Sequence, residues 1–328
     1  MRRKLCEAVT MALSVNTAAQ KIVQSLINEK DQLSVKVTQT EEGTTIIDVG
    51  LEARGGYVAG QLVTEVCMGG LGTASLGTWN VHDFCLPGIT VMTDCPAIAL
   101  LGSQFAGWRV KVGQYFAMGS GPARALALKP RDLYAKIGYR DEADIATIFL
   151  EASALPPKDT LDHLLTECQV RPDRLSVIVA STSSIAGSTQ ISGRILETGL
   201  HKLTECGLDP QTVLSGVGYA PIAPIHPKVN IAMGRTNDMI LYGGEVFFTV
   251  ASEDDDALQK IVEQTPSSQS RDYGRPFATI FKDAGYDFYK IDPALFAPAL
   301  VTVNNVITGK SFTAGAINVS VLKQSIGL

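Results

Sequence analysis

The stretch from residue 175 to residue 207 reads LSVIVASTSSIAGSTQISGRILETGLHKLTECG and points to the fold class. Residues 175–180, LSVIVA, are apolar except for Ser176 and have the length of a buried strand. A hydroxyl-rich loop follows, and the residues from about Thr189 to Cys206 have the pattern of a helix, which Gly207 ends. A strand followed by a helix is the unit of α/β proteins, and the carboxyl end of such a strand is a favoured place for a ligand.

Strand and helix patterns alternate on both sides of this unit. Before it, the sequence predicts strands at 33–38, 44–49, 88–93, 109–112 and 145–150, and helices at 15–30, 59–68, 96–107 and 159–168. After it come a predicted hairpin with strands Met239–Leu241 and Val246–Val250 around Gly243–Gly244, a helix at 255–264, a second hairpin with strands 300–306 and 311–313, and a short helix from Val319. Helices mixed with hairpins favour an α/β protein, α+β-like, with mixed rather than all-parallel sheets.

The length of 328 residues is sufficient for two domains that share an interface. The polar stretch 138–144 predicts the boundary between an N-terminal α/β domain at 14–140 and a C-terminal α/β domain at 141–328. The C-terminal hairpin is a candidate for crossing back to the first domain.

Composition and charge argue against several classes of protein. A formal net charge of -5 is unsuited to a nucleic-acid binder, which needs a basic face. No apolar run approaches the roughly 20 residues that span a bilayer, and the short apolar part near the start contains Glu7, so neither a membrane protein nor a secreted one is expected. The six cysteines form no C-x-x-C pair and the four histidines have no metal-ligand spacing. We therefore expect a cytoplasmic protein with reduced cysteines and no metal.

The first candidate for chemistry is residues 117–128, AMGSGPARALAL. The proline at position 122 suits the first position of a helix, so the residues before it would form a loop that leads into the helix. Free N–H groups at a helix N-terminus attract an anion, and a guanidinium adds a partner for phosphate or carboxylate. This interpretation assigns to substrate binding Gly119, Ser120, Gly121 and Arg124. A tight loop whose glycines only allow close packing explains the motif equally well.

The second candidate follows the strand at 175–180. Arg194 and Glu197 lie three residues apart and so share one face of the predicted helix. Glu197 is a candidate general base or acid, and Arg194 would orient water and stabilise developing negative charge. Ser184 and Gln190, in the loop and the start of the helix, are candidate substrate-binding residues. Periodicity alone favours a simpler interpretation, a polar face in solvent opposite a leucine face.

Two further motifs are less specific. Residues 233–238, MGRTND, precede the first predicted hairpin and suit either a turn or a ligand contact, with Arg235 and Asn237 as candidate substrate-binding residues. Residues 286–293, YDFYKIDP, are rich in aromatic side chains, which we expect to belong to the core rather than to a stacking platform.

Several stretches spread over the chain carry a family resemblance. They are EVCMGGL at 65–71, YFAMGSGPARALALKP at 115–130, GSTQISGRILETG at 187–199, YAPIAPI at 219–225, GRTNDMILYGG at 234–244, RDYGRPF at 271–277 and YDFYKIDPALFAP at 286–298. With them the chain resembles methenyltetrahydromethanopterin cyclohydrolase from about Ser14 to Leu328. It departs from the usual pattern of the family at Ser181 and Ser183, where Pro and Ala are common, and residues 1–13 extend beyond the family's usual start.

The resemblance implies two α/β domains that flank a deep pocket, a homotrimer, and neither a metal nor a redox cofactor. It implies reversible hydrolysis of 5,10-methenyl-tetrahydromethanopterin to the 5-formyl form, in the one-carbon metabolism of methanogenesis. The catalytic Arg and Glu of the family fall on Arg194 and Glu197, and the phosphorylated tail of the pterin offers an anion to the stretch 119–124. A non-catalytic pterin carrier and another formyl- or methenyl-pterin enzyme are the alternatives.

Overall fold

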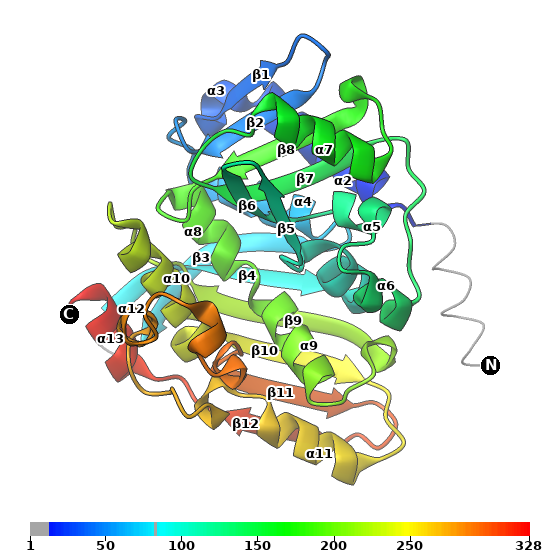
Figure 1. Ribbon diagram of the computed structural model, residues 1–328. Helices are drawn as coiled ribbons and strands as arrows, with labels where there is room; N and C mark the ends of the chain where they lie inside the picture. Colours follow the sequence, from blue (N-terminus) through cyan, green and yellow to red (C-terminus); the bar gives the residue numbers. More distant parts are fainter. Residues whose placement is uncertain (1–12, 82–83) are drawn as a thin grey trace.

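The structure is a computed structural model that describes residues 13–81 and 84–328 (Figure 1). It contains two six-stranded mixed sheets with helices packed on them, which confirms the predicted α/β fold class. In the view of Figure 1 one sheet lies above the other, and they are called here the upper sheet and the lower sheet.

The upper sheet has the strand order β1-β2-β8-β7-β6-β5. Its strands are β1 Lys36–Gln39, β2 Thr45–Gly50, β5 Trp108–Val112, β6 Tyr115–Ser120, β7 Ala146–Ala152 and β8 Leu175–Ala180. Strands β2, β8 and β7 run parallel, and the other neighbours pair antiparallel. All of β8 is buried, because α2 (Val15–Asn28) and α4 (Tyr57–Cys67) pack on one face and α5 (Ala123–Ala127) and α7 (Lys158–Cys168) on the other. Cover on both faces explains why this strand is apolar at every position except Ser176.

The lower sheet has the order β12-β11-β10-β9-β4-β3. Its strands are β3 Thr73–Val81, β4 Phe84–Thr93, β9 Val213–Pro221, β10 Glu245–Val250, β11 Leu300–Asn305 and β12 Ser311–Gly315. Only β10 and β11 pair in parallel among these neighbours. The π-helix η1 (Ala97–Gln104), α9 (Ile195–Glu205) and α11 (Asp255–Gln264) share one apolar core with one face of this sheet.

The remaining elements connect and cap these layers. They are the helices α3 Lys30–Leu33, α6 Arg131–Ile137, α8 Ile185–Ser192, α10 Val229–Gly243, α12 Phe277–Asp283 and α13 Val319–Ile326, and the short 3-10 turns η2 Pro172–Arg174, η3 Pro210–Thr212, η4 Ser267–Gln269, η5 Phe288–Lys290 and η6 Pro293–Leu295. Within the described ranges, no helix has both the length and the apolar composition needed to cross a bilayer.

The hairpin predicted around Gly243–Gly244 is wrong. Residues 229–243 form the single helix α10, which runs directly into β10. The apolar run Met239–Leu241 is buried on every side, and a short run of that kind does not distinguish a strand from a buried helix. Residues 233–238, which suited a turn or a ligand contact, are likewise helical and lie in the middle of α10.

Strand β9 has no counterpart among the predicted strands because glycine is depleted in strands and β9 contains two. A Cβ on Gly216 would lie 2.9 Å from the Phe248 ring, and one on Gly218 would lie 3.2 Å from the Cβ of Leu196. These glycines let α9 and its apolar side chains approach the sheet closely. The sequence patterns also do not predict strands β3 and β6.

Each sheet draws strands from both sides of the predicted boundary at 140/141. Strands β3 and β4 precede that boundary yet belong to the lower sheet, and β7 and β8 follow it yet belong to the upper sheet. The last hairpin, β11 and β12, pairs within the lower sheet. The boundary therefore does not separate the two sheets.

Helices α4 and α8 cross closely at glycines. A Cβ on Gly60 would lie 2.5 Å from the Cβ of Thr189 and 2.7 Å from the carbonyl oxygen of Ala186. A Cβ on Gly193, just after α8, would lie 2.5 Å from the side chain of Thr64. The absence of side chains at these positions allows the two backbones to approach each other closely.

We expect Gly60→Ala to lower the free energy of unfolding by about 1–3 kcal/mol, because the added methyl group meets a backbone carbonyl that cannot move alone. Urea denaturation measures the difference. Gly77→Ala is the control, since a Cβ there meets no atom within 4 Å. Equal midpoints for the two variants would show that the crossing tolerates a side chain.

Asp238 in α10 is a buried carboxyl group that joins three helices. It accepts a hydrogen bond of 2.8 Å from the backbone N–H of Phe277 at the start of α12, and another from the hydroxyl of Ser325 in α13. Burial raises the pKa of Asp238 to about 7, although both hydrogen bonds act in the opposite direction. The folded state therefore holds this proton more strongly than the unfolded chain does.

It follows that the contribution of Asp238 to stability is present at low pH and is lost as the pH rises towards 7. We expect Asp238→Asn to remove this loss, so that its free energy of unfolding declines less than that of the wild type between about pH 5 and 8. Asp238→Ala is the comparison and should be less stable than Asp238→Asn by about 1–3 kcal/mol, because it leaves the donors of both partners unpaired. If the free energy of unfolding of the wild type and of Asp238→Asn changed with pH in parallel, the raised pKa of Asp238 would be contradicted.

Candidate functional site

The predicted helix at 189–206 is two helices, and the candidate catalytic pair lies where they meet. Helix α8 ends at Ser192 and α9 begins at Ile195, so Arg194 immediately precedes α9 and Glu197 lies in its first turn. The side-chain amide of Gln104, at the end of η1, donates a hydrogen bond of 3.0 Å to the carbonyl of Gly193. The junction is thus in contact with α4, where Gly193 lies against Thr64, and with η1, where Gln104 donates to the carbonyl of Gly193.

Arg194 and Glu197 form an ion pair at this junction. The Nε and Nη2 atoms of Arg194 donate to the same Oε2 atom of Glu197, at 3.0 and 2.8 Å. The side chain of Arg194 is 22% exposed and that of Glu197 only 2% exposed. Burial acts to lower the pKa of Arg194, but the charge and hydrogen bonds of Glu197 outweigh it, and the pKa is raised. A carboxylate in the first turn of α9 is also stabilised by the helix dipole.

Polar residues from the upper sheet and its helices surround the pair. Glu151, at the end of β7, attracts Arg194 and accepts a hydrogen bond from the hydroxyl of Thr182. Cys67, at the end of α4, accepts a long hydrogen bond of 3.8 Å from the side-chain amide of Gln190. Burial raises the pKa of Cys67 to about 12, so this cysteine is a neutral thiol and not a nucleophile.

Glu151 is a site residue that the sequence reasoning missed. It lies opposite Met118 of β6, and Met118 lies opposite Arg109 of β5, so the three are register neighbours across the upper sheet. A signal was available, because Glu151 directly follows the predicted strand at 145–150 and strand carboxyl ends favour ligands. The connection to Arg194 depends on strand pairing that no local pattern reveals.

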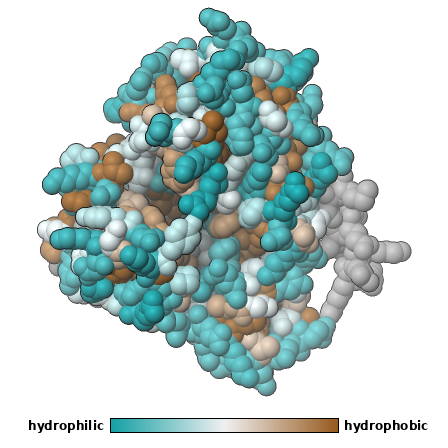
Figure 2. Space-filling view, in the orientation of Figure 1, coloured by the Kyte–Doolittle hydropathy of each residue, from teal (hydrophilic) through white to brown (hydrophobic). Residues whose placement is uncertain are grey.

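Arg109 also connects the two halves of the molecule. Its guanidinium donates to the hydroxyl of Tyr289 and lies 5.6 Å from the centre of the Tyr289 ring. Tyr289 belongs to η5, in the segment that leads into the lower sheet, and Arg109 to β5 of the upper sheet. The surface is hollowed between the upper and lower halves near the middle of Figure 2, in the part of the view where Figure 1 places α8 and the β5–β6 hairpin.

The aromatic residues at 286–289 are exposed, so the expectation that they belong to the core is wrong. The exposed fractions of Tyr286, Phe288 and Tyr289 are 55%, 44% and 79%. Phe288 still packs against Phe281 with ring centres 4.6 Å apart, which anchors one edge of the segment.

The loop predicted at residues 119–121 requires correction. Gly119 and Ser120 end strand β6, and α5 has only five residues. Ser120 is buried and donates its hydroxyl to the carbonyl of Gln104. Gly121 adopts φ +101°, and its N–H donates to the carbonyl of Ser103 at 2.9 Å. The hydroxyl of Ser120 and the N–H of Gly121 therefore donate to carbonyls of η1, and they do not form an open helix N-terminus.

Arg124 is fully buried, which does not suit the predicted role of anchoring an anionic tail. Its Nε donates to the carbonyl of Lys129 at 2.8 Å, and its Nη1 donates to the carbonyls of Leu101 and Ser103 at 3.1 and 3.0 Å. Its guanidinium also lies 5.2 Å from the ring centre of Phe105.

The other candidate substrate-binding residues fall into two groups. Ser184 caps the N-terminus of α8 and accepts a hydrogen bond from Gly187, while Gln190 is buried in the same helix near Arg194. Arg235 donates at 3.3–3.4 Å to carbonyls of the loop before α10 and of the C-terminal helix α13. Asn237 donates back to the carbonyl of Met233 within α10. Gln190 is therefore near the ion pair, Ser184 lies at the opposite end of α8, and Arg235 and Asn237 make contacts of a structural kind.

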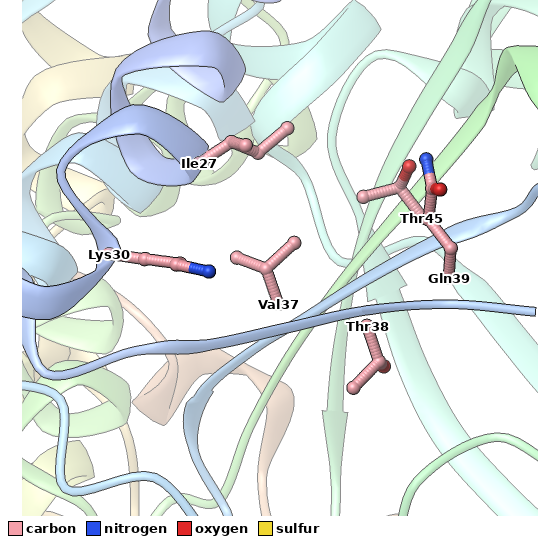
Figure 3. A pocket seen from close by; sticks show the side chains of 6 residues that line it. All are labelled: Ile27, Lys30, Val37, Thr38, Gln39 and Thr45. Atoms are coloured by element: carbon pink, nitrogen blue, oxygen red, sulfur yellow. The ribbon is translucent and has the colours of Figure 1, made fainter.

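Two cavities lie away from the ion pair. One of about 320 Å³ lies beside the edge strand β1, where Lys30 extends towards Val37 below Ile27 (Figure 3). The other, of about 420 Å³, lies between the loop after α4 and the strands β4 and β9. Neither is lined by Arg194 or Glu197. Among residues 13–81 and 84–328, no three His, Cys, Asp or Glu side chains are grouped as metal ligands.

Comparison with known proteins identifies the family to which this arrangement belongs. Residues 14–326 match the family model described as Cyclohydrolase (MCH). A methenyltetrahydromethanopterin cyclohydrolase from Methanothermobacter marburgensis is 48% identical over 96% of this chain and 100% of its own length. Proteins of the same name from Methanocaldococcus jannaschii and Methanococcoides burtonii are 46% and 44% identical, each over 96% of this chain and 98% and 99% of their own lengths. The chain therefore belongs to the cyclohydrolase (MCH) family of enzymes.

Proposed function

We propose that this protein catalyses the reversible hydrolysis of 5,10-methenyl-tetrahydromethanopterin to 5-formyl-tetrahydromethanopterin in one-carbon metabolism. The observation that carries the proposal is the buried, hydrogen-bonded Arg194–Glu197 pair at the α8–α9 junction. The relatives with this name cover nearly the whole chain, which supports the assignment.

The methenyl carbon bridges two nitrogens and shares their positive charge, so it is already electrophilic. Water must lose a proton as it attacks, and Glu197 accepts that proton as a general base. Arg194 orients the water and stabilises the negative charge that develops on its oxygen. The tetrahedral adduct then breaks one C–N bond. Its hydroxyl releases its proton to solvent as the formyl C=O forms, and Glu197 returns the first proton to the leaving nitrogen, so that hydrolysis of the methenyl cation releases one proton in all.

A cationic substrate beside Arg194 is electrostatically unfavourable, and two carboxylates offset this cost. Glu197 holds Arg194 directly, and Glu151 attracts the same guanidinium from the end of β7. Because Glu197 takes the proton of the attacking water, it must lie closer to the reacting carbon than the guanidinium of Arg194 does. The substrate then meets a site whose positive charge is already balanced.

We propose further that the enzyme works in the cytoplasm with neither a metal nor a redox cofactor. The substrate supplies its own electrophilic carbon, and no electrons are exchanged in the hydrolysis. Water, a base and a group that stabilises an alkoxide are sufficient for this reaction.

A non-catalytic pterin carrier is the alternative from a different class, and another formyl- or methenyl-pterin enzyme is the alternative within enzymes. The geometry favours turnover, because a carrier does not need a buried carboxylate tied to a guanidinium, whose burial costs free energy. Absorbance of the methenyl chromophore distinguishes these cases, since a carrier binds methenyl-pterin without bleaching it.

We expect Glu197→Gln to lower kcat by about 10²–10⁴-fold with little change in substrate affinity, because the amide cannot accept the proton of water. The decay of the methenyl chromophore measures kcat, and equilibrium binding measures affinity. Glu205→Gln is the matched control on the same helix, since Glu205 pairs at the surface with Lys202. Near-normal turnover of Glu197→Gln would remove Glu197 from the mechanism.

We also propose that the protein is a homotrimer that buries the outer face of the lower sheet. Met92, Val217 and Phe247 are register neighbours on β4, β9 and β10, and their exposed fractions are 44%, 42% and 44%. The flanking positions on this face carry mostly hydroxyl groups, among them Thr90, Ser215, Thr249, Thr302 and Thr313. The neighbours of this apolar row are uncharged except for Glu245, and such a surface is typical of one that another subunit covers.

We expect Phe247→Lys to shift the protein from trimer to monomer in light scattering, because the ammonium would be buried without a partner. Val229→Lys is the control, since Val229 is 52% exposed at the start of α10 and lies outside the sheet. An unchanged mass for Phe247→Lys would exclude this face as the interface.

A further inference from the structure

A side-chain contact joins the two halves of the molecule at the hollow of Figure 2, and the proposed mechanism does not use it. The guanidinium of Arg109 donates a hydrogen bond to the hydroxyl of Tyr289 and lies 5.6 Å from the centre of its ring. Both side chains are exposed, that of Tyr289 to 79%. A contact between exposed side chains adds little to stability, so stability alone does not explain its place over a hollow.

The side chain of Arg109 points to the open face of the upper sheet. Its neighbours in β5, Trp108 and Val110, are buried in the core beneath α5 and α7. Because side chains alternate along a strand, Arg109 points to the opposite face. There the core beneath α2 and α4 takes side chains from β2, β7 and β8 but, among the residues that the structure describes, none from β5 or β6. These helices therefore leave the face of β5 and β6 uncovered.

A row of side chains crosses this open face. Met118 of β6 lies opposite Arg109, and Glu151 of β7 lies opposite Met118, so the three side chains point to the same side. Two strand spacings separate the ends of the row, which places the backbones of Arg109 and Glu151 about 10 Å apart. Strand β5 is an edge strand, so Arg109 forms the outer end of the row.

The inner side of the same face connects to the catalytic pair. Ser120 lies two residues beyond Met118 on β6 and therefore on the same face, where it is buried. Its hydroxyl donates to the carbonyl of Gln104, and the amide of Gln104 donates to the carbonyl of Gly193, next to Arg194. The open face thus leads from an exposed edge to the buried ion pair.

The segment that carries Tyr289 is fixed in its backbone but not in this side chain. Asp287 accepts a hydrogen bond of 3.0 Å from the N–H of Tyr289, and the ring of Phe288 lies 4.6 Å from that of Phe281. Within the described ranges, the hydroxyl and ring of Tyr289 have Arg109 as their partner. The contact can therefore open when two exposed side chains rotate, which takes picoseconds to nanoseconds, with neither sheet moving.

We propose that Arg109 and Tyr289 form a clasp across the mouth of the proposed active site, which opens before a substrate enters or a product leaves. The proposal rests on the proposed function for the identity of the substrate, but not for the clasp itself. Because opening is fast, the rates of binding and release are each reduced to the fraction of time that the clasp is open. A clasp that closes equally over the empty and the occupied site changes both rates by one factor and leaves the dissociation constant unchanged.

The kinetic test uses Arg109→Met in the Glu197→Gln background, where methenyl-pterin is expected to bind without turnover. Quenching of the intrinsic fluorescence in stopped flow measures both rates. We expect binding and release each to accelerate by about two- to tenfold, the factor that an exposed cation–π contact and one hydrogen bond supply, with an unchanged dissociation constant. Arg109→Lys keeps a cation and a donor and should keep the parent rates. Lys111→Met is the control, since Lys111 is exposed on the same strand and face.

Tyr289→Ala tests whether the two residues act together. It should give the same factor as Arg109→Met, and the double variant should give no more, because either change alone opens the clasp. Factors that multiply in the double variant would overturn the proposal, and so would unchanged rates in Arg109→Met. Faster release with unchanged binding would overturn it too, because Arg109 would then contact the bound substrate directly.

A second test needs no substrate. Met118→Cys places a thiol on the open face behind the clasp, and mass spectrometry measures its modification by a maleimide. Native Cys85, exposed on β4, is the internal reference. We expect Arg109→Met to accelerate modification at position 118 relative to Cys85, and equal rates would overturn the clasp. Faster modification in a protein that neither binds nor converts methenyl-pterin would reject the proposed function and leave the clasp intact.

Discussion

The ion pair between Arg194 and Glu197 is the interaction around which this molecule is organised. A carboxylate with 2% of its side chain exposed can stay charged only where its partner is held in a fixed place. That place is the junction of α8 and α9, where one helix ends before Gly193 and the next begins after Arg194. The break in the helix brings the guanidinium to the first turn of α9, which already favours a negative charge.

Close backbone packing holds this junction in position. The glycines at 60 and 193 let α8 lie directly on α4, and the glycines at 216 and 218 let α9 lie directly on the lower sheet. One helix is thereby fixed to the upper sheet and the next to the lower sheet, with the ion pair between them. The ion pair therefore lies between the two sheets, and interfaces of this kind are common places for ligand sites.

The sequence predicts the strand at 175–180, the helical region after it and the pairing of Arg194 with Glu197, because all three depend on local spacing. It does not predict that the helix breaks at Gly193, where a Cβ would meet Thr64 of another helix. It does not predict Glu151 as a neighbour of Arg194 either, since Glu151 lies on β7 and Arg194 follows β8 in the chain, and local spacing does not reveal that β7 and β8 pair. The hairpin around Gly243–Gly244 failed for a related reason, because burial on every side removes the periodicity that separates helix from strand.

Arg124 shows that the type of residue does not by itself predict an anion-binding site, because its side chain points into the protein and not to the surface. A glycine-rich stretch followed by a guanidinium has the composition of an anion site, and at a surface it would be one. Here the strand β6 extends through Gly119 and Ser120, and the following turn directs Arg124 inward onto η1. Its guanidinium then donates to the carbonyls of Leu101, Ser103 and Lys129 and faces the ring of Phe105, so the same positive charge packs against η1 inside the protein instead of meeting an anion in solution.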